Sequence, residues 1–378
     1  MIAPGTHTLP DGREAEVVEI AAGALRARVA TLGAALLNLW APDARGHAAD
    51  VTLGHADLEG YSEDPAYLGV AVGRTAGRIA GARVTVDGTA HALDANDGAN
   101  ALHGGPHGLS WKVWRVESQA PDRVTLAAES PAGEGGYPGR LAARLTYGLA
   151  PEASGDAVTL ALDWHAEADA PTPVALTHHP YWNLRGHAAG GLGAHLVQSD
   201  AARYLALDGL VPSGETPPVD GTALELRRPT PLALAFAEAL DAPQEADRPQ
   251  TSGGPIARAG GLDHDLLVPP LGRRQAPLRR VLRLHNGHAD GRARGLDVWT
   301  TEPGVHLYDG AHLDVPRAKG GARYGPRAGL AVETQPPPDA TRISGSPHVP
   351  SVVLRPGEAL RSRTEYRFHT QPPEALGG

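Results

Sequence analysis

The sequence predicts an all-β protein, a large antiparallel β-sandwich or barrel, and three observations carry this prediction. Apolar residues recur with a period of two over many short stretches, as expected for half-buried strands. Glycine and proline, which disfavour helices, account for 47 and 34 of the 378 residues and mark frequent turns. The regular strand–helix alternation of a parallel α/β sheet is missing from the sequence.

The first clear element is a tight hairpin. Apolar and polar residues alternate over 83–86 and again over 89–93. Between them stands Asp87-Gly88, a pair that tolerates the positive φ values of a type I′ turn. Two further strands are predicted over 141–147 and 158–164, separated by a turn that contains proline and glycine.

A second hairpin and a single helix are predicted later in the chain. Strands over 281–285 and 296–300 flank a longer tip that contains Asn286-Gly287. The helix is predicted over 232–240, with Thr230 as N-cap and Pro231 in the first helical position. The polar stretch 241–260, rich in proline and glycine, is expected to be a surface loop.

Composition and charge exclude several kinds of site and partner. The chain has no cysteine, which rules out disulfides, cysteine-ligated zinc, iron–sulfur clusters and a cysteine nucleophile. Its net charge of −9 argues against binding of nucleic acid through bulk electrostatics. No apolar run approaches the roughly 18 residues of a membrane helix, and residues 1–7 do not resemble a signal peptide. We therefore expect a cytoplasmic protein with neither nucleic-acid nor membrane partners.

Two glycine-rich segments carry basic side chains. Residues 73–81 lack the spacing and the lysine of a phosphate-binding loop, but an arginine at such a turn can direct its planar donor group toward a ligand oxygen. In residues 100–108, His103 and His107 have the separation of a zinc-binding helical pair, yet the intervening Gly-Gly-Pro disfavours a helix. The alternatives are a surface or carbonyl-binding arginine and a solvated or structural histidine.

Residues 177–184, Thr-His-His-Pro-Tyr-Trp-Asn-Leu, follow a strand pattern and suit a sugar site. Aromatic rings stack on the C–H faces of a sugar while polar groups bond to its hydroxyls. Because strand side chains alternate, His179 and Tyr181 share one face and His178 lies on the other. An aromatic-rich strand end without a function fits the same composition.

The remaining segments are 261–265, 301–305 and 329–335. Glu333 ends an apolar strand pattern. A carboxylate at the end of a buried strand needs either a partner that compensates its charge or a functional role. A structural salt bridge would serve equally well. None of these segments identifies a function on its own.

Taken together and in this order, the segments resemble the aldose 1-epimerase (galactose mutarotase) family from about residue 50 to residue 358. The collinear matches are residues 73–79, 102–105, 134–139, 172–184, 262–264, 301–305 and 333–335. The resemblance implies a single domain over 1–378 that folds as a galactose mutarotase-like supersandwich with an open sugar cleft. It also implies an aldose substrate, a monomer or homodimer, and a reaction without metal or other cofactor.

By motif match, the resemblance implies that His179 is the general acid and Glu333 the general base. It implies that Arg78, His103 and Asp263 bind and polarise the sugar. The further positions that it places at the sugar site are Gly77, Tyr181 and Glu302.

An acid and a base suit the chemistry of exchanging α and β anomers. One group takes the proton of the C1 hydroxyl while the other gives a proton to the ring oxygen, so the ring opens to the aldehyde. Rotation about C1–C2 and closure with reversed transfers give the other anomer. A histidine with a reference pKa of ~6.5 and a glutamate with one of ~4.3 start close to the required states, so modest tuning is expected to suffice.

The sequence departs from the family pattern beside the expected site. Gly77 stands where asparagine is usual, and Glu302 brings a negative charge where glutamine is usual. Pro180 and Trp182 replace a serine and a phenylalanine, and stiff prolines follow at 336–338. The acid and the base are retained, so we expect the reaction class to hold while the sugar preference stays open.

Three other functions stay open at this point. An epimerase of a phosphorylated or less common sugar could use the same fold, although a phosphate would need additional basic residues at the cleft. A carbohydrate-binding sandwich without catalysis would not need both His179 and Glu333. A glycoside hydrolase normally needs two carboxylates that flank the bond, a pair that Asp263 and Glu333 could imitate.

Overall fold

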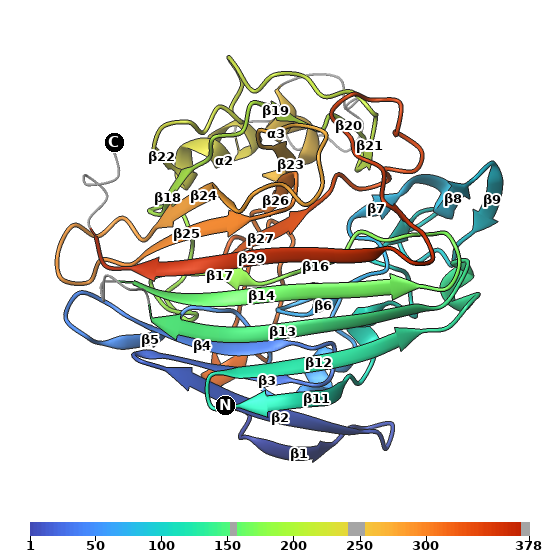
Figure 1. Cartoon of the computed structure of the whole chain (residues 1–378). Helices are drawn as coiled ribbons and strands as arrows, with labels where there is room; N and C mark the ends of the chain where they lie inside the picture. The colour runs from blue at the N-terminus through green and yellow to red at the C-terminus, as the bar shows by residue number, and fades with distance from the viewer. Residues whose placement is uncertain (152–156, 241–253, 372–378) are drawn as a thin grey trace.

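The computed structural model describes residues 1–151, 157–240 and 254–371. These residues form three large sheets, in which every strand pairing is antiparallel (Figure 1). The first sheet has the order β1 (Gly5–Thr8), β2 (Glu14–Ala22), β3 (Leu25–Ala30), β4 (Leu36–Pro42) and β5 (Ala48–Asp50).

A nine-stranded sheet runs across the molecule in Figure 1. Its order is β11 (Arg115–Ala120), β12 (Arg123–Ser130), β13 (Leu141–Pro151), β14 (Ala157–Ala168), β29 (Ala359–His369), β25 (Gly295–Thr300), β24 (Arg279–His285), β18 (Leu196–Gln198) and β22 (Thr230–Pro231). The third sheet has the order β17 (Tyr181–Trp182), β27 (Leu330–Gln335), β26 (Gly304–Tyr308), β23 (Asp263–Leu267) and β19 (Arg203–Tyr204).

Five two-stranded pairs and a few short helices complete the described residues. The pairs are β6 (Ala71–Val72) with β16 (Thr177–His178), β7 (Arg78–Ile79) with β10 (Ala101–Leu102), β8 (Arg83–Val86) with β9 (Thr89–Ala92), β15 (Thr172–Pro173) with β28 (Val353–Leu354), and β20 (Leu207–Asp208) with β21 (Val211–Pro212). The helices are α1 (Leu58–Ser62), α2 (Leu232–Leu240) and α3 (Pro255–Ala259), with 3-10 turns over Ala80–Ala82, Leu109–Trp111, Glu134–Gly136 and Lys319–Gly321. Within these described parts of the chain, no helix is long and apolar enough to cross a membrane.

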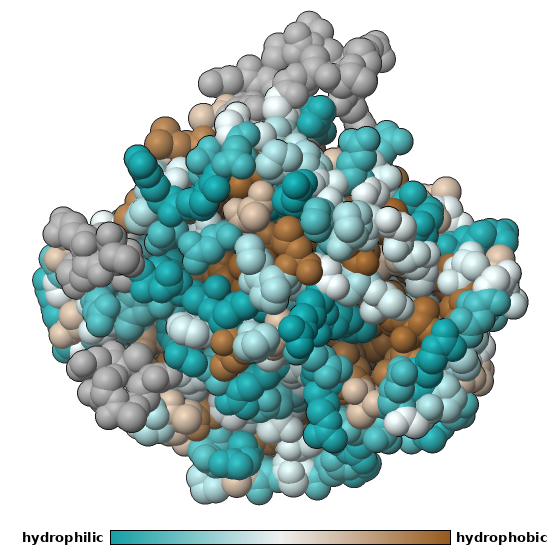
Figure 2. All heavy atoms as spheres, turned by 45° about the horizontal axis from the view of Figure 1, so that its top comes forward, coloured by the Kyte–Doolittle hydropathy of each residue, from teal (hydrophilic) through white to brown (hydrophobic). Residues whose placement is uncertain are grey.

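One buried apolar cluster joins the three sheets. It includes Val18 of β2, Leu145 of β13, Tyr366 of β29 and Val332 of β27, and strand β2 packs against β12 and β13. Burial of this apolar surface is the main driving force for stacking the sheets. On the outside, hydrophilic residues dominate the face shown in Figure 2, and apolar residues are visible mainly in its hollows.

The predicted all-β fold class is confirmed, and both hairpins form. Strands β8 and β9 pair around Asp87 and Gly88, which have φ values of 49° and 80°, as a type I′ turn requires. Strands β24 and β25 pair as predicted around the tip that contains Asn286-Gly287. Strands β13 and β14 also pair, and both are longer than predicted. The turn between them, residues 152–156, lies outside the described residues.

The predicted helix over 232–240 is confirmed as α2, but its predicted start is wrong. Thr230 and Pro231 form strand β22, which pairs with β18, and the Thr230 hydroxyl donates to the carbonyl of Arg228. Pairing with a neighbouring strand therefore replaces the N-cap. Of the loop predicted over 241–260, residues 241–253 lie outside the described residues, and Pro255–Ala259 form helix α3 instead of a loop.

Candidate active site

A pocket of about 630 Å³ opens beside the sheet of β17, β27, β26, β23 and β19. Six of the eight site residues predicted from the sequence line it, although they come from widely separated segments of the chain. These six are Arg78, His103, His179, Tyr181, Asp263 and Glu333. The fold thus brings most of the predicted site together in one cavity.

Strand alternation around β17 aims His179 and Tyr181 into this pocket. The backbone N–H of His179 donates to the carbonyl of Val70, so extended structure continues through Pro180. His178, on the opposite face, packs its ring against Tyr147 in the core. The predicted sharing of one face by His179 and Tyr181 is therefore confirmed.

Trp182 belongs to the core rather than to the pocket. Its side chain is fully buried and packs against Tyr366 and Phe368, with ring centroids 4.9 and 5.5 Å away. The tryptophan at this position thus fills space between two sheets. It adds no aromatic surface to the pocket wall.

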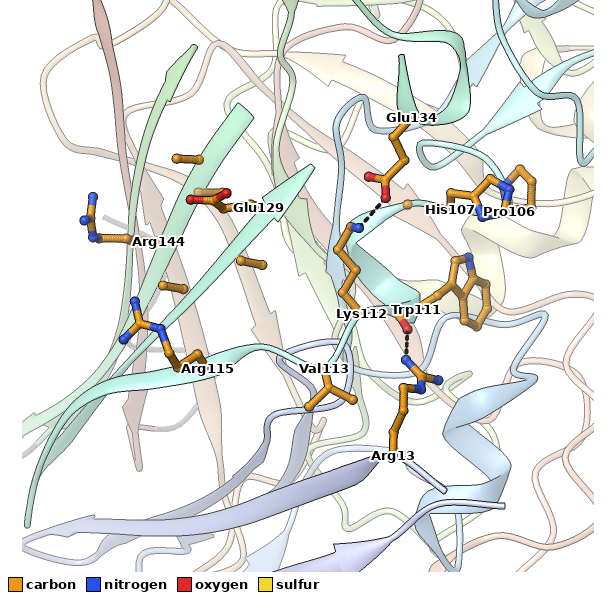
Figure 3. A pocket seen from close by; sticks show the side chains of 15 residues that line it. Arg13, Pro106, His107, Trp111, Lys112, Val113, Arg115, Glu129, Glu134 and Arg144 are labelled. Carbon is orange, nitrogen blue, oxygen red and sulfur yellow. Dashed lines mark hydrogen bonds and ion pairs between the residues drawn. The ribbon is translucent and has the colours of Figure 1, made fainter. Parts of the chain in front are cut away.

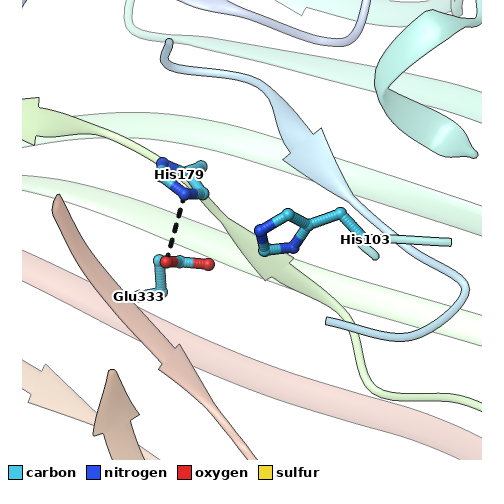
Figure 4. Close-up of side chains that lie close together, drawn as sticks. All are labelled: His103, His179 and Glu333. Atoms are coloured by element: carbon cyan, nitrogen blue, oxygen red, sulfur yellow. Dashed lines mark ion pairs between the residues drawn. The ribbon is translucent and has the colours of Figure 1, made fainter. Parts of the chain in front are cut away.

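His179 and Glu333, which both line the pocket, are in direct contact (Figure 4). The His179 Nε2 atom lies 3.2 Å from Glu333 Oε1, and the two side chains are only 5% and 1% exposed. Glu333 is on β27, and its register partner on β26 is His306. A histidine and a carboxyl group at this distance can exchange a proton directly.

Burial moves the pKa values of these two groups in opposite directions. Removal from water disfavours the charged form of each, which raises the pKa of Glu333 to about 8 and lowers the pKa of His179 to about 4. The expectation that modest tuning suffices is therefore wrong, because near neutral pH the resting protein has a protonated Glu333 and a neutral His179. The pair as a whole still carries one proton, as the reaction requires.

His103 faces the pair as a neutral hydrogen-bond donor. Its ring meets that of His179 edge-on, 5.3 Å between centroids, and burial lowers the pKa of His103 well below its usual range. The backbone N–H of Gly77 donates to His103 Nδ1 at 3.3 Å, which leaves the hydrogen of the neutral ring on Nε2. The next residue is necessarily glycine, because a Cβ at Gly104 would lie 2.0 Å from the carbonyl oxygen of Gly73.

Gly77 itself does not line the pocket. It supports His103 through its backbone, and with φ of +70° a Cβ there would lie 2.5 Å from Pro338 Cβ. Two departures from the family pattern, the glycine at 77 and the prolines at 336–338, are thus in contact with each other. The missing side chain at 77 makes room for the proline ring.

The two arginines of residues 73–81 have different roles. Arg78 reaches the pocket from β7 and is held by Asp97, with 2.7 Å between Nε and Oδ2. Arg74 is buried and donates to the carbonyls of Ser130, Pro131 and Pro138. The carbonyl-binding alternative is therefore correct for Arg74.

His306 is the main pocket residue that sequence reasoning missed. It lies between two aspartates, with Nε2 3.0 Å from Asp263 Oδ1 and Nδ1 3.1 Å from Asp265 Oδ2. Although burial favours the neutral ring, the two carboxylates outweigh it and raise the pKa of His306 well above its usual range. The available signal was strand alternation beyond residue 305, which puts His306 and Tyr308 on one face.

Glu302, predicted as a sugar-site residue, is not among the pocket-lining residues. It is buried just before β26 and accepts, through its backbone carbonyl, a hydrogen bond from Arg279. The strand that begins at Gly304 carries the chain from Glu302 to the pocket, where His306 lies. The structure therefore places Glu302 apart from the six predicted residues that line the pocket.

Donor atoms of His103, His179 and Glu333 lie within 4.8 Å of one another, a spacing that invites comparison with metal sites. Two of their atoms already have partners: Glu333 Oε1 contacts His179 Nε2, and His103 Nδ1 accepts from the backbone N–H of Gly77.

A second pocket of about 630 Å³ lies over β11, β12 and β13 (Figure 3). Its charged groups are paired locally: Lys112 Nζ lies 2.6 Å from Glu134 Oε1, and Arg13 donates to the carbonyl of Trp111. None of the six predicted site residues above lines it. The six predicted residues therefore meet in the first pocket and not in this one.

Comparison with known proteins gives matches over nearly the whole chain. The family model of aldose 1-epimerase matches residues 16–367. The chain is 36% identical to galactose mutarotase of Homo sapiens over 94% of this chain and 95% of that protein, and 33% identical to aldose 1-epimerase of Escherichia coli K12 over 89% and 90%. A crystal structure of a GalM/aldose epimerase homologue from C. elegans is 28% identical, with a TM-score of 0.79, and covers 94% of this chain and 100% of its own.

Proposed function

The chain belongs to the aldose 1-epimerase family and is an isomerase of this kind, and we propose that it interconverts the α and β anomers of free hexoses such as D-galactose and D-glucose. In this proposal, His179 is the general acid and Glu333 the general base. The observation that carries it is their 3.2 Å contact in a sugar-sized pocket.

The reaction starts from the single proton that the pair carries. Transfer of this proton from Glu333 to His179 across their contact gives the carboxylate and the imidazolium. Glu333 then takes the proton of the C1 hydroxyl, and His179 gives its proton to the ring oxygen, so the C1–O5 bond breaks. After rotation about C1–C2, the reverse transfers close the ring on the other face.

Arg78 and the Nε2–H of His103 are donors for the sugar oxygens on which negative charge develops. Asp263 accepts a hydrogen bond from a sugar hydroxyl. Because Arg78 is oriented by Asp97 and Asp263 by His306, these groups are held in place before the sugar binds. Tyr181, with its ring 5.0 Å from that of His179, provides an aromatic wall.

The charge of the pocket favours a free sugar over a phosphorylated one. Three cationic side chains line it, Arg78, Arg317 and His306, and they face Asp97, Asp57 and Asp263 respectively. Further carboxyl groups in the lining are those of Glu63, Asp64 and Asp314, while Glu333 rests as the neutral acid. A phosphate dianion would meet this acidic lining without an unpaired cation to bind it.

The two carboxyl groups alone do not separate anomerisation from glycoside hydrolysis. Although burial favours the neutral acid, the contact with His306 holds the pKa of Asp263 at about 2, so this group stays ionised. With Glu333 in its neutral form, an ionised Asp263 gives the unlike pair that a hydrolase would also use. The direct contact of Glu333 with His179 favours the epimerase, in which these two groups exchange a proton.

A polarimetric assay separates these functions. We expect the protein to accelerate the equilibration of freshly dissolved α-D-galactose and α-D-glucose well above the buffer rate, with a much weaker effect on a hexose 6-phosphate. A preference for the phosphorylated sugar would contradict the proposed substrate. Release of reducing sugar from a glycoside, or sugar binding without acceleration, would contradict the proposed reaction.

We further propose that residues 1–378 act as one domain, as a monomer or homodimer in the cytoplasm. The buried apolar cluster that joins β2, near the start of the chain, to β29, near its end, supports the single domain. Limited proteolysis would test the single domain, and sedimentation of the purified chain would test the oligomeric state.

A further inference from the structure

We propose that His306 is a positioning residue of the reaction, a fixed positive charge that lowers the proton affinity of the His179–Glu333 pair as a whole. The proposal rests on the roles of His179 and Glu333 given above. It goes beyond them because a third side chain, which transfers no proton itself, determines the pH range of the reaction.

The register of three neighbouring strands places His306 between carboxyl groups. On β26, His306 is the register partner of Asp265 on β23 and of Glu333 on β27. Register partners on one face have Cβ atoms about 4.5–5.5 Å apart. His179 continues the row, because it contacts Glu333 from the segment before β17. The acid–base pair therefore lies next to His306 in the plane of the sheet.

The charge on His306 is held by contacts on both sides of its ring. Each ring nitrogen lies within 3.1 Å of a carboxylate oxygen, from Asp263 and Asp265. Asp265 is in turn fixed by Gln335, whose Nε2 donates to Oδ1 at 3.0 Å. Two anions against one ring keep both nitrogens protonated at neutral pH, and the contact with Gln335 prevents Asp265 from turning away.

The sign of the effect is the same for both members of the pair. A positive charge stabilises the Glu333 carboxylate and destabilises the His179 imidazolium, so it lowers the pKa of each. The aspartates beside His306 act in the opposite direction on Glu333. Without His306, burial and two anions would act together and make it harder for Glu333 to lose its proton.

Other charged and titratable groups also face this cluster. Around Glu333 and His306 these are Arg78 from β7, Asp263, His264 and Asp265 from β23, His103, His179 and Tyr181 from the pocket wall, Asp64 near His179, and Tyr366 from β29. His306→Gln removes none of these groups and keeps a polar side chain beside Asp263 and Asp265, so the change made to the cluster is the loss of one positive charge.

The test is the pH profile of kcat/KM for galactose anomerisation in wild type and in His306→Gln, corrected for the buffer rate. The wild type should show a plateau between limbs near pH 4 and pH 8, where the pair gains and loses its proton. Glutamine keeps a polar donor but removes the charge, so both limbs should move to higher pH by about 1 to 3 units. A packing defect would lower the plateau without moving the limbs.

His165→Gln is the matched control, because His165 is also a strand histidine beside a carboxylate, 3.7 Å from Glu167, but does not line this pocket. Its limbs should coincide with those of the wild type. If only one limb of the pH profile moves in His306→Gln, or if neither moves, the proposal is overturned. If Glu333→Gln keeps a near-normal rate, the proposed base is wrong, and that result is distinct from an unmoved profile in His306→Gln.

A measurement on the unmodified protein covers the case in which His306→Gln does not fold. The ¹⁵N shifts of the His306 ring should show both nitrogens protonated at pH 7 and at pH 8, while the ring of His179 is neutral. A neutral His306 ring at pH 7 would overturn the proposal, whatever the variant does.

Discussion

Replacement of Glu333 by glutamine is expected to lower kcat for anomer interconversion about 10²- to 10⁴-fold, the usual contribution of a positioned general base. The amide has nearly the shape of the carboxyl group but cannot take the proton of the C1 hydroxyl. Because burial raises the pKa of Glu333 to about 8, the resting side chain is the neutral acid, and a neutral amide suits the same buried position on β27. The free energy of unfolding should therefore change little.

Polarimetry on freshly dissolved α-D-galactose measures this effect. A rise in KM with an unchanged kcat would not fulfil the prediction. Glu302→Gln is the matched control, since Glu302 is as deeply buried as Glu333, with each 1% exposed, but does not line the pocket. That variant should anomerise galactose at a rate close to that of the wild type. A near-normal kcat in Glu333→Gln would contradict the assignment of the base.

Replacement of Trp182 by alanine is expected to lower the free energy of unfolding by about 3–5 kcal/mol, the usual cost of removing a large buried ring. The ring is fully buried and packs against Tyr366 and Phe368 of the nine-stranded sheet, so its loss leaves a cavity between two sheets. Urea denaturation followed by circular dichroism measures the change.

Trp182→Phe is the control for this variant. The indole Nε1 of Trp182 is buried without a hydrogen-bond partner among the described residues, so phenylalanine loses no such bond. Its cost should stay below about 1.5 kcal/mol, as for other conservative core exchanges. A loss of activity per folded molecule in Trp182→Phe, with unchanged stability, would contradict the placement of Trp182 in the core.

The features that could be predicted from the sequence are those with local signals. Asp87-Gly88 encodes its own turn, and the alternation through residues 177–184 places His179 and Tyr181 on one face whatever the rest of the chain does. The start of α2 was missed because its first residues pair with β18, a partner that is remote in sequence. Local capping signals do not report such a competition.

The parts of the site that the sequence could not provide depend on contacts between strands. His306 becomes a pocket residue only because β26 lies between β23 and β27, which bring Asp265 and Glu333 to its two sides. The protonation states of His179 and Glu333 likewise follow from burial, which reverses the states expected from ordinary pKa values. The sequence motifs identify His179 and Glu333, and the packing of the strands around them determines their protonation states.

A crystal structure of Glu333→Gln with D-galactose bound tests the central claim most directly, because the amide keeps nearly the shape of the carboxyl group while the two anomers no longer exchange rapidly in the site. We predict that the ring oxygen lies about 2.6–3.2 Å from His179 Nε2 and that the C1 hydroxyl lies at a similar distance from the side chain of residue 333. A sugar bound in the pocket over β11–β13, or one whose ring oxygen and C1 hydroxyl both face away from His179 and residue 333, would contradict the proposed mechanism.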